Sequence, residues 1–183
     1  QSSYLGPLSS AGMILEWLHA EQKLPDGLSV KLRTELVDYV DDVDNGRVAP
    51  VSHVPCFPRI VEALNQPAKT EDEFDSAFRV ASDIALAYVK GIEAGYYQAL
   101  EAERVVVEAM RKAVSNGSNV MIFDGYYRWK GIYFEHGGEE HPTEFVLFPG
   151  TDGTWRVVAI PPVQGSFDQK QSLPEAWAGL SDS

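Results

Sequence analysis

The predicted fold is organised around the stretch Val40-Asp41-Asp42-Val43-Asp44-Asn45-Gly46. At 3.6 residues per turn, the apolar residues from Leu32 to Val43 form one face of a helix, and Asp41 and Asp44 lie one turn apart along its edge. Asn45-Gly46 ends the helix, because glycine readily adopts the left-handed conformation that follows a last turn. Both carboxylates therefore fall where the negative end of the helix dipole costs each about 0.3–1 kcal/mol.

The acidic end of this helix has two interpretations. Five of residues 35–44 are acidic, and such a cluster is most often a solvated surface. A hard divalent cation bound by aspartate oxygens would instead offset both the dipole penalty and the mutual repulsion of the carboxylates. The spacing of the acids alone favours the solvated surface, so a metal site needs support from elsewhere in the chain.

The composition is that of a folded but acidic protein. Of its 183 residues, 44% are hydrophobic and 11% are aromatic, which is enough to build a core. The formal net charge of −12 repels phosphate backbones, so an action on nucleic acid requires local cations or a metal ion. The single cysteine, Cys56, cannot form an intramolecular disulfide, and no apolar run is long enough to span a bilayer. We therefore expect a soluble, cytoplasmic protein with no membrane contact.

Helical patterns dominate the first third of the chain. They predict three helices, over residues 10–23, 28–44 and 59–64. Ser9-Ser10 is a typical N-cap for the first helix, because a serine side chain accepts a hydrogen bond from an early backbone N–H. Prolines between residues 47 and 58 exclude a continuous helix or a central strand there. The predicted first domain, residues 1–67, is therefore helical.

A long helix opens the predicted second domain, residues 68–183. Thr70 and Glu73 have the spacing of a capping box, and apolar residues recur every three or four positions from there to Asn116-Gly117. Unbroken, such a helix measures about 65 Å at 1.5 Å per residue, longer than a small domain is wide. We therefore expect either a bend near Gly91–Gly95 or a helix that bridges two lobes.

After Gly117 the apolar period changes to two residues, which is typical of strands. Strands are predicted over residues 120–123, 129–135, 144–148 and 154–160. Thr151-Asp152-Gly153 indicates a hairpin between the last two. An antiparallel sheet packed on the long helix accounts for these patterns, so the predicted fold class is α+β for this chain. A short helical turn is expected over residues 173–180.

Three further groups carry reactive or ligating side chains. The run His136-Gly137-Gly138-Glu139-Glu140-His141 contains four potential metal ligands, but its glycines and a following proline favour a solvated loop. Cys56 and His53 lack a third, orienting residue for nucleophilic catalysis. Aromatic residues interleaved with cations in residues 126–156 resemble a face that stacks nucleobases, although core packing explains such residues more often.

Several stretches, taken in order, resemble the melanocyte proliferating gene family, which is also catalogued as metal-dependent protein hydrolases within the DHH phosphoesterase superfamily. The family's Asp-x-Val/Ile-Asp-Asn-Gly signature is similar to residues 41–46, and its Ser-Ser-Ala-Gly helix start is similar to Ser9-Ser10-Ala11-Gly12. The other matching stretches are Arg59-Ile60-Val61-Glu62-Ala63-Leu64-Asn65, Phe74–Ala77, Trp129-Lys130, Trp155-Arg156-Val157, Ser166-Phe167 and Leu173–Leu180. The match runs nearly from end to end of the chain.

The resemblance implies a two-lobed α/β phosphoesterase that holds manganese-type ions and acts as a 3′–5′ exonuclease on RNA. It implies that Asp41 or Asp44 is a metal ligand, and the choice between them stays open. Arg59, Lys170 and Arg156 are the corresponding candidates for contacts with substrate phosphate. Lys170 stands where the family has arginine, so a point charge replaces a two-pronged donor. The oligomeric state is left open, and a homo-oligomer is compatible with the resemblance.

Two motifs of the family are absent from residues 1–183. These are the early His-Asn-Gly-x-Phe-His-x-Asp-Glu motif and the Asp-His-His motif, which would supply most of the metal ligands. We therefore expect a fragment, the distal part of the DHH-like lobe followed by the substrate-binding lobe, that is inactive on its own. The alternative is a non-catalytic module that binds protein or RNA.

Overall fold

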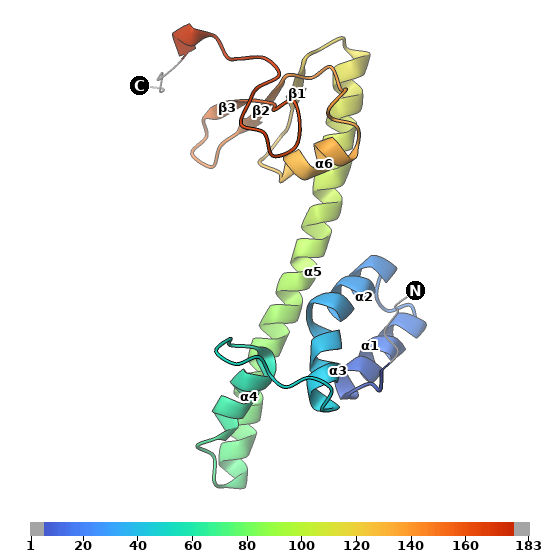
Figure 1. The fold of residues 1–183 in the computed structure, drawn as a ribbon, viewed down its shortest axis with the longest axis vertical. Coiled ribbons are helices and arrows are strands. Elements are labelled where there is room, and N and C mark those ends of the chain that lie inside the picture. The colour runs from blue at the N-terminus through green and yellow to red at the C-terminus, as the bar shows by residue number, and fades with distance from the viewer. Residues whose placement is uncertain (1–5, 178–183) are drawn as a thin grey trace. The chain divides into compact units, whose positions relative to one another are not determined.

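The computed structural model describes residues 6–177. The chain divides into two compact units, Gln1–Tyr96 and Tyr97–Ser183, and each is described by itself below. One helix, α5 (Glu71–Ser115), supplies residues to both units (Figure 1). Within the described residues, no helix combines the length and the apolar composition needed to cross a membrane.

Unit 1, residues 1–96, is built of helices. Before α5 it contains α1 (Ser10–Ala20), α2 (Asp26–Leu32), the π-helical segment η1 (Arg33–Val37), α3 (Asp38–Asp44) and α4 (Phe57–Asn65). These elements confirm the three helices predicted before residue 67. The second predicted helix is divided, because η1 joins α2 to α3 with a wider helical turn.

The core of unit 1 joins its first helices to α5. Its buried residues are Leu15, Leu28, Leu32, Val37 and Ile92. Ile92 belongs to α5, and the partly buried Val89 and Tyr96 of the same helix pack on this cluster. The N-terminal half of α5 is therefore part of unit 1, whereas the sequence predicts a boundary near residue 67. The reason is that these three side chains of α5 pack on apolar residues of α1, α2 and η1.

The start of α5 has the predicted capping box. The Thr70 hydroxyl accepts a hydrogen bond from the N–H of Glu73 at 3.3 Å. Oε2 of Glu73 accepts hydrogen bonds from the N–H groups of Thr70 and Lys69 at 3.0 and 2.7 Å. The helix then continues for 45 residues with no interruption at Gly91 or Gly95. Of the two predicted alternatives, the uninterrupted helix is the one found.

Unit 2 contains a three-stranded mixed sheet. Its strands, in spatial order, are β1 (Val120–Ile122), β2 (Phe145–Pro149) and β3 (Trp155–Ala159). β2 and β3 form the predicted antiparallel hairpin, in which Leu147 lies opposite Val157. β1 and β2 are parallel, with Met121 opposite Val146. The α+β class is confirmed, but the prediction of a fully antiparallel sheet is wrong.

The parallel pairing follows from helix α6 (Trp129–Glu135), where the sequence pattern predicts a strand. α6 lies between β1 and β2 in the chain, and a crossover of this kind lets the second strand run in the same direction as the first. Trp129 and Tyr133 lie one helical turn apart, and both are buried in the core of unit 2. This spacing of four is a helical signal, which the strand-forming composition of the segment conceals.

One face of the sheet packs on α5 and α6. The buried residues of this core are Val106, Ala109, Met110, Ala113, Met121, Phe123, Trp129, Tyr133, Val146, Phe148 and Ile160. The helical turn predicted over 173–180 corresponds to the 3-10 helix η2 (Glu175–Trp177). The rest of that predicted turn lies outside the described residues.

Candidate functional site

Asp41, in α3, is a fully buried aspartate, with 0% of its surface exposed. Its Oδ1 accepts hydrogen bonds from the backbone N–H of Ser9 at 3.0 Å and from the Ser9 hydroxyl at 2.5 Å. Ser9 is the N-cap of α1, and its hydroxyl oxygen also accepts hydrogen bonds from the N–H groups of Ala11 and Gly12. The Asp41 carboxylate therefore lies at the N-terminus of α1, where the positive end of the helix dipole favours an anion.

Gly12 leaves the room that this carboxylate occupies. A Cβ atom at Gly12 would lie 2.3 Å from Oδ2 of Asp41 and 2.6 Å from its Oδ1. These distances are far below van der Waals contact, so a larger residue at this position would displace the carboxylate. The serine and the glycine at the start of α1 therefore form one packing unit with Asp41.

Arg33 is the second buried charged residue near α1. It lies in η1 with 4% of its surface exposed, and its guanidinium forms ion pairs with Glu16 and, at 3.2 Å, with Asp38. Its Nη1 also lies 4.0 Å from Oδ2 of Asp41, an oxygen that accepts no hydrogen bond from the described residues. Burying a carboxylate is costly unless positive charge lies close to it. Arg33 and the N-terminus of α1 supply that positive charge to Asp41.

Asn45 ties the end of α3 to the segment before α1. Its Nδ2 donates to the carbonyl oxygen of Asp41 at 2.8 Å and to that of Pro7 at 3.0 Å. Arg47 donates to the same Pro7 carbonyl at 3.1 Å. Residues 7–12 and 41–47 are thus joined by several hydrogen bonds, and we call this pair of segments the clasp.

Asp44 has a different environment from Asp41. It is exposed, and it takes part in no hydrogen bond or ion pair with another described residue. It is the last residue of α3 and precedes Asn45 and Gly46, whose φ of +68° is the predicted left-handed helix end. Of the two candidate aspartates, only Asp44 presents its carboxylate to solvent.

The described residues do not build a complete metal site by themselves. Among residues 6–177, no group of three or more histidine, cysteine, aspartate or glutamate side chains is arranged to hold an ion. Asp41 offers no accessible oxygen, and Asp44 offers one carboxylate where a hard divalent cation takes about six oxygen ligands. A manganese ion at Asp44 would therefore need ligands from outside the described residues.

Two of the predicted phosphate contacts are arginines that lie in weak, exposed ion pairs. Arg59, near the start of α4 in unit 1, pairs with Glu62 at 2.9 Å. Arg156, on β3 in unit 2, pairs with Asp152 at 3.3 Å. Exposed pairs of this kind are worth about 1 kcal/mol or less, so either guanidinium can exchange its partner for a phosphate at little cost.

Lys170, the third predicted phosphate contact, has its ammonium hydrogen-bonded to other parts of unit 2. Its Nζ donates to the hydroxyl of Tyr133 at 3.0 Å and to the carbonyl oxygens of Gly138 and His141 at 2.6 and 2.8 Å. A lysine ammonium has three N–H donors, so these acceptors use all of them. In this conformation Lys170 holds residues 136–141, and its role in binding phosphate stays a prediction.

Cys56 and His53 do not form a catalytic pair in the described structure. Cys56 is the N-cap of α4 and accepts a hydrogen bond from the Tyr39 hydroxyl at 3.4 Å, which lowers the pKa of the thiol. His53 is exposed and makes no hydrogen bond with another described residue. The thiol therefore has a tyrosine, not an imidazole, beside it.

The histidines at the two ends of residues 136–141 have separate partners. His136 contacts Glu103 at 3.2 Å, and Nδ1 of His141 lies 2.8 Å from the Thr143 hydroxyl. Burial lowers the pKa of His141. The two imidazoles therefore have different partners and do not point to one common metal ion, in keeping with the solvated loop predicted from the sequence.

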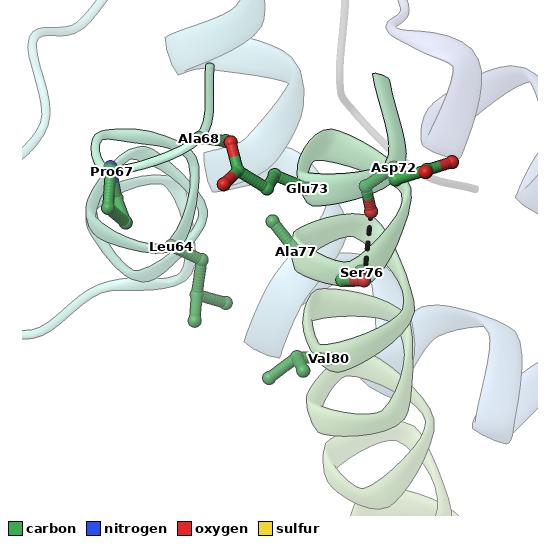
Figure 2. A pocket seen from close by; sticks show the side chains of 8 residues that line it. All are labelled: Leu64, Pro67, Ala68, Asp72, Glu73, Ser76, Ala77 and Val80. Carbon is green, nitrogen blue, oxygen red and sulfur yellow. Dashed lines mark hydrogen bonds between the residues drawn. The ribbon is translucent and has the colours of Figure 1, made fainter. Parts of the chain in front are cut away.

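A pocket of about 490 Å³ lies between the end of α4 and the start of α5 in unit 1 (Figure 2). It is lined by Leu64, Pro67, Ala68, Asp72, Glu73, Ser76, Ala77 and Val80. The Ser76 hydroxyl donates to the Asp72 carbonyl at 2.9 Å, and Glu73 belongs to the capping box. The described residues that line it include no basic residue, histidine or cysteine, so none of them brings a positive charge to a phosphate.

Sequence reasoning misses Ser9, Gly12 and Arg33 as partners of Asp41. The motif around Ser9 identifies a helix cap but not a hydrogen bond to a residue 32 positions away. The small residue three positions after that cap is a usable signal, since a glycine inside a helix costs about 1 kcal/mol and needs a reason. Arg33 gives no such signal, because periodicity does not reveal a π-helical segment.

Comparison with known proteins gives a match over almost the whole chain. The family model of MYG1 exonuclease, described as uncharacterised protein family UPF0160, matches residues 3–183. The MYG1 protein of Chlamydia trachomatis is 34% identical over an alignment of 184 positions, which covers 98% of this chain and 61% of that protein. The MYG1 exonuclease of Rattus norvegicus is 28% identical over an alignment of 205 positions, which covers 96% of this chain and 52% of the relative. No solved structure matches.

The chain spans about three fifths of the length of the chlamydial relatives it matches. These matches confirm the family that the residue motifs resemble, while its placement in the DHH superfamily stays a prediction. Since the family model covers nearly all of the residues, this chain belongs to the MYG1 family, uncharacterised protein family UPF0160.

Proposed function

We propose that this chain is the distal portion of a manganese-dependent nuclease, a phosphoesterase that removes nucleotides from the 3′ end of RNA. The rat and mouse relatives are named MYG1 exonuclease, which supports this class of activity. The observation that carries the proposal is the exposed carboxylate of Asp44, presented at the end of a helix that the clasp holds in place. In the proposal Asp44 is the metal ligand and Asp41 is not.

The residues of this chain have limited roles in the proposed reaction. A divalent cation, when bound, would activate water and stabilise the leaving oxygen. Asp44 supplies one oxygen ligand, and the other ligands come from outside the described residues. Arg59, in the same unit as Asp44, neutralises substrate phosphate after leaving its exposed partner Glu62. Within the described residues this is a partial site, which is why we expect the chain alone to be inactive.

A nuclease assay tests the proposal. The purified 183-residue chain is expected to release no nucleotides from a 3′-labelled RNA oligonucleotide in manganese. The complete Chlamydia trachomatis relative, as the positive control, is expected to release them and to stop when the metal is chelated. Turnover by the 183-residue chain contradicts the expected inactivity. A complete relative that leaves the RNA intact contradicts the nuclease assignment itself.

A second candidate function is the binding of single-stranded RNA without catalysis. Tyr126 is 68% exposed and its ring packs edge-on against Phe148, at 5.6 Å between centroids. Arg128 and Lys130 follow it in the chain, are exposed, and form no ion pair with another described residue. An exposed ring followed in the chain by two exposed cations is suited to stack a base and hold a phosphate.

The binding alternative predicts an affinity that falls steeply with salt and drops several-fold in Tyr126→Ala. Fluorescence anisotropy with a labelled oligonucleotide measures both effects. Tyr88→Ala, at another half-exposed tyrosine, is the matched control and is expected to change nothing. Trp129 is unsuitable for this test, because it is only 4% exposed and its removal would disturb the core. Equal losses in the two tyrosine variants would argue against this surface.

A further inference from the structure

The clasp brings together two stretches of sequence that are 32 residues apart, the start of α1 and the last turn of α3. We propose that Asp41 is a positioning residue and not a cation ligand. It fixes the first turn of α1 to α3 and thereby holds the turn on which Asp44 is presented. The role given to Asp44 rests on the proposed function, whereas the packing role of Asp41 does not.

Both oxygens of the Asp41 carboxylate are buried beside the first turn of α1, although only Oδ1 accepts hydrogen bonds from it. Oδ1 accepts two hydrogen bonds from Ser9, one from the backbone and one from the hydroxyl. Oδ2 lies beside Gly12, so close that a Cβ atom on residue 12 would clash with it. A hard cation would have to approach to about 2.0–2.6 Å of an oxygen. Oδ2 is buried and has no contact with solvent, so a cation cannot reach it while the clasp is intact.

The charge of Asp41 is also compensated without a metal ion. The N-terminus of α1 and the buried guanidinium of Arg33 both lie beside the carboxylate. The penalty expected for an acid in the last turn of α3 is thus offset by the dipole of a second helix. The unfavourable position of Asp41 is therefore explained by its partners in the fold.

The same contacts fix the turn that carries Asp44. Asn45, the residue after it, donates to the carbonyl oxygens of both Asp41 and Pro7. The side chain of Asp41 therefore bonds to Ser9, and the backbone carbonyl of Asp41 bonds to the Asn45 side chain. Both contacts hold the turn. Loss of the Asp41 carboxylate is expected to loosen this turn even where the fold survives.

A double-mutant cycle tests the packing role. Gly12→Ala is expected to lower the melting temperature by about 3–10 °C, since the new methyl group displaces the carboxylate. The three atoms nearest to that methyl all belong to the Asp41 carboxylate. In an Asp41→Ala background the same change is therefore expected to be harmless, or to raise the melting temperature by about 2–4 °C through helix propensity. An equal loss in both backgrounds overturns the proposal.

Two neighbouring serines provide a matched control for the cycle. Ser9→Ala is expected to lower the melting temperature by about 2–6 °C, because it removes the hydroxyl shared by Asp41 and the α1 cap. Ser10→Ala, at an exposed position one residue later, is expected to leave it unchanged. Equal effects of the two substitutions would contradict the clasp.

Manganese titration followed by NMR tests the positioning role. Mn²⁺ is expected to broaden the amide signals of residues 44–46 in the wild-type chain and not in Asp44→Asn. The Gly12→Ala/Asp41→Ala variant, although folded, is expected to show at least several-fold weaker broadening there, which a purely structural role would not produce. Broadening that survives in Asp44→Asn but disappears in Asp41→Asn overturns the proposal. Absence of broadening in the wild-type chain counts against Asp44 as a ligand, and the cycle still decides the role of Asp41.

Discussion

Asp41 and Asp44 are chemically identical side chains one helical turn apart, yet their surroundings are opposite. Packing of α1 covers the side of α3 that carries Asp41, and it leaves Asp44 exposed. The sequence pattern identifies both acids and leaves the choice between them open. The choice depends on Ser9 and Gly12, which lie far away in the sequence and close in the fold.

Lys170 is a basic residue whose surroundings are likewise decided by the fold. The family resemblance implies that Lys170 contacts substrate phosphate. In the fold its ammonium is surrounded by the Tyr133 hydroxyl and two backbone carbonyls. A buried carbonyl left without a donor is costly, so this lysine has a clear structural purpose.

Replacement of Lys170 by methionine is therefore expected to destabilise the protein. The change keeps most of the apolar stem but removes the ammonium donor from three oxygens and leaves the His141 carbonyl without it, at a cost of about 1–3 kcal/mol. Denaturant unfolding measures the effect. Lys130→Met is the matched control, since Lys130 is exposed on α6, and it is expected to stay within about 0.5 kcal/mol of the wild type. A Lys170→Met protein as stable as the wild type would restore Lys170 as a candidate substrate contact.

At the scale of elements, local signals predict helix starts and turns well. The capping box of α5, the glycine after α3 and the hairpin between β2 and β3 all form as expected. Each depends on residues within about four positions of one another, so the chain nearby decides the outcome. α6 is the exception, because its aromatic composition is typical of strands while its burial follows a helical spacing.

The capping box gives a prediction for the start of α5. Thr70→Ala removes the acceptor for the Glu73 N–H and is expected to cost about 0.5–2 kcal/mol of stability.

The N–H groups of Lys69 and Thr70 lower the pKa of Glu73 in the folded protein. The stability that the Glu73 carboxylate adds by capping α5 is therefore present above the unfolded pKa and is lost as pH falls through the folded pKa. The amide shifts of Lys69 and Thr70 are expected to follow that titration.

Glu73→Gln separates the charge of this side chain from its capping geometry. Glutamine also fits the capping box, so the variant is expected to keep the helix start and lose the acidic titration of the two amides. NMR titration of both proteins measures the difference. An unchanged titration in Glu73→Gln would show that another acid is responsible.

At the scale of the whole molecule, the two units have separate cores. The core of unit 1 includes Leu28 and Leu32, and that of unit 2 includes Tyr133 and Val146. Domains with cores of their own tend to open as separate cooperative units. The helix α5 contributes side chains to both cores, so its two halves belong to different units.

Leu28→Ala is expected to destabilise unit 1 by about 2–5 kcal/mol, since Leu28 is 1% exposed. Amide hydrogen exchange in α1 and α3 should accelerate, while exchange in β2 should stay near the wild-type rate. Val146→Ala, at a fully buried residue of unit 2, is expected to have the reverse effect. Acceleration in both units from either substitution would show that the chain opens as one cooperative unit.

The amino-acid sequence alone determined the helix caps and stops, the long helix, the β2–β3 hairpin, the α+β class and, through its ordered motifs, the family. These features depend on neighbouring residues, whose backbone preferences and side-chain hydrogen bonds act over a few positions. Only the tertiary structure decided which aspartate is buried, the donors around Lys170 and the parallel direction of β1 and β2. Each of these depends on residues more than twenty positions apart, which only packing of the folded chain brings into contact.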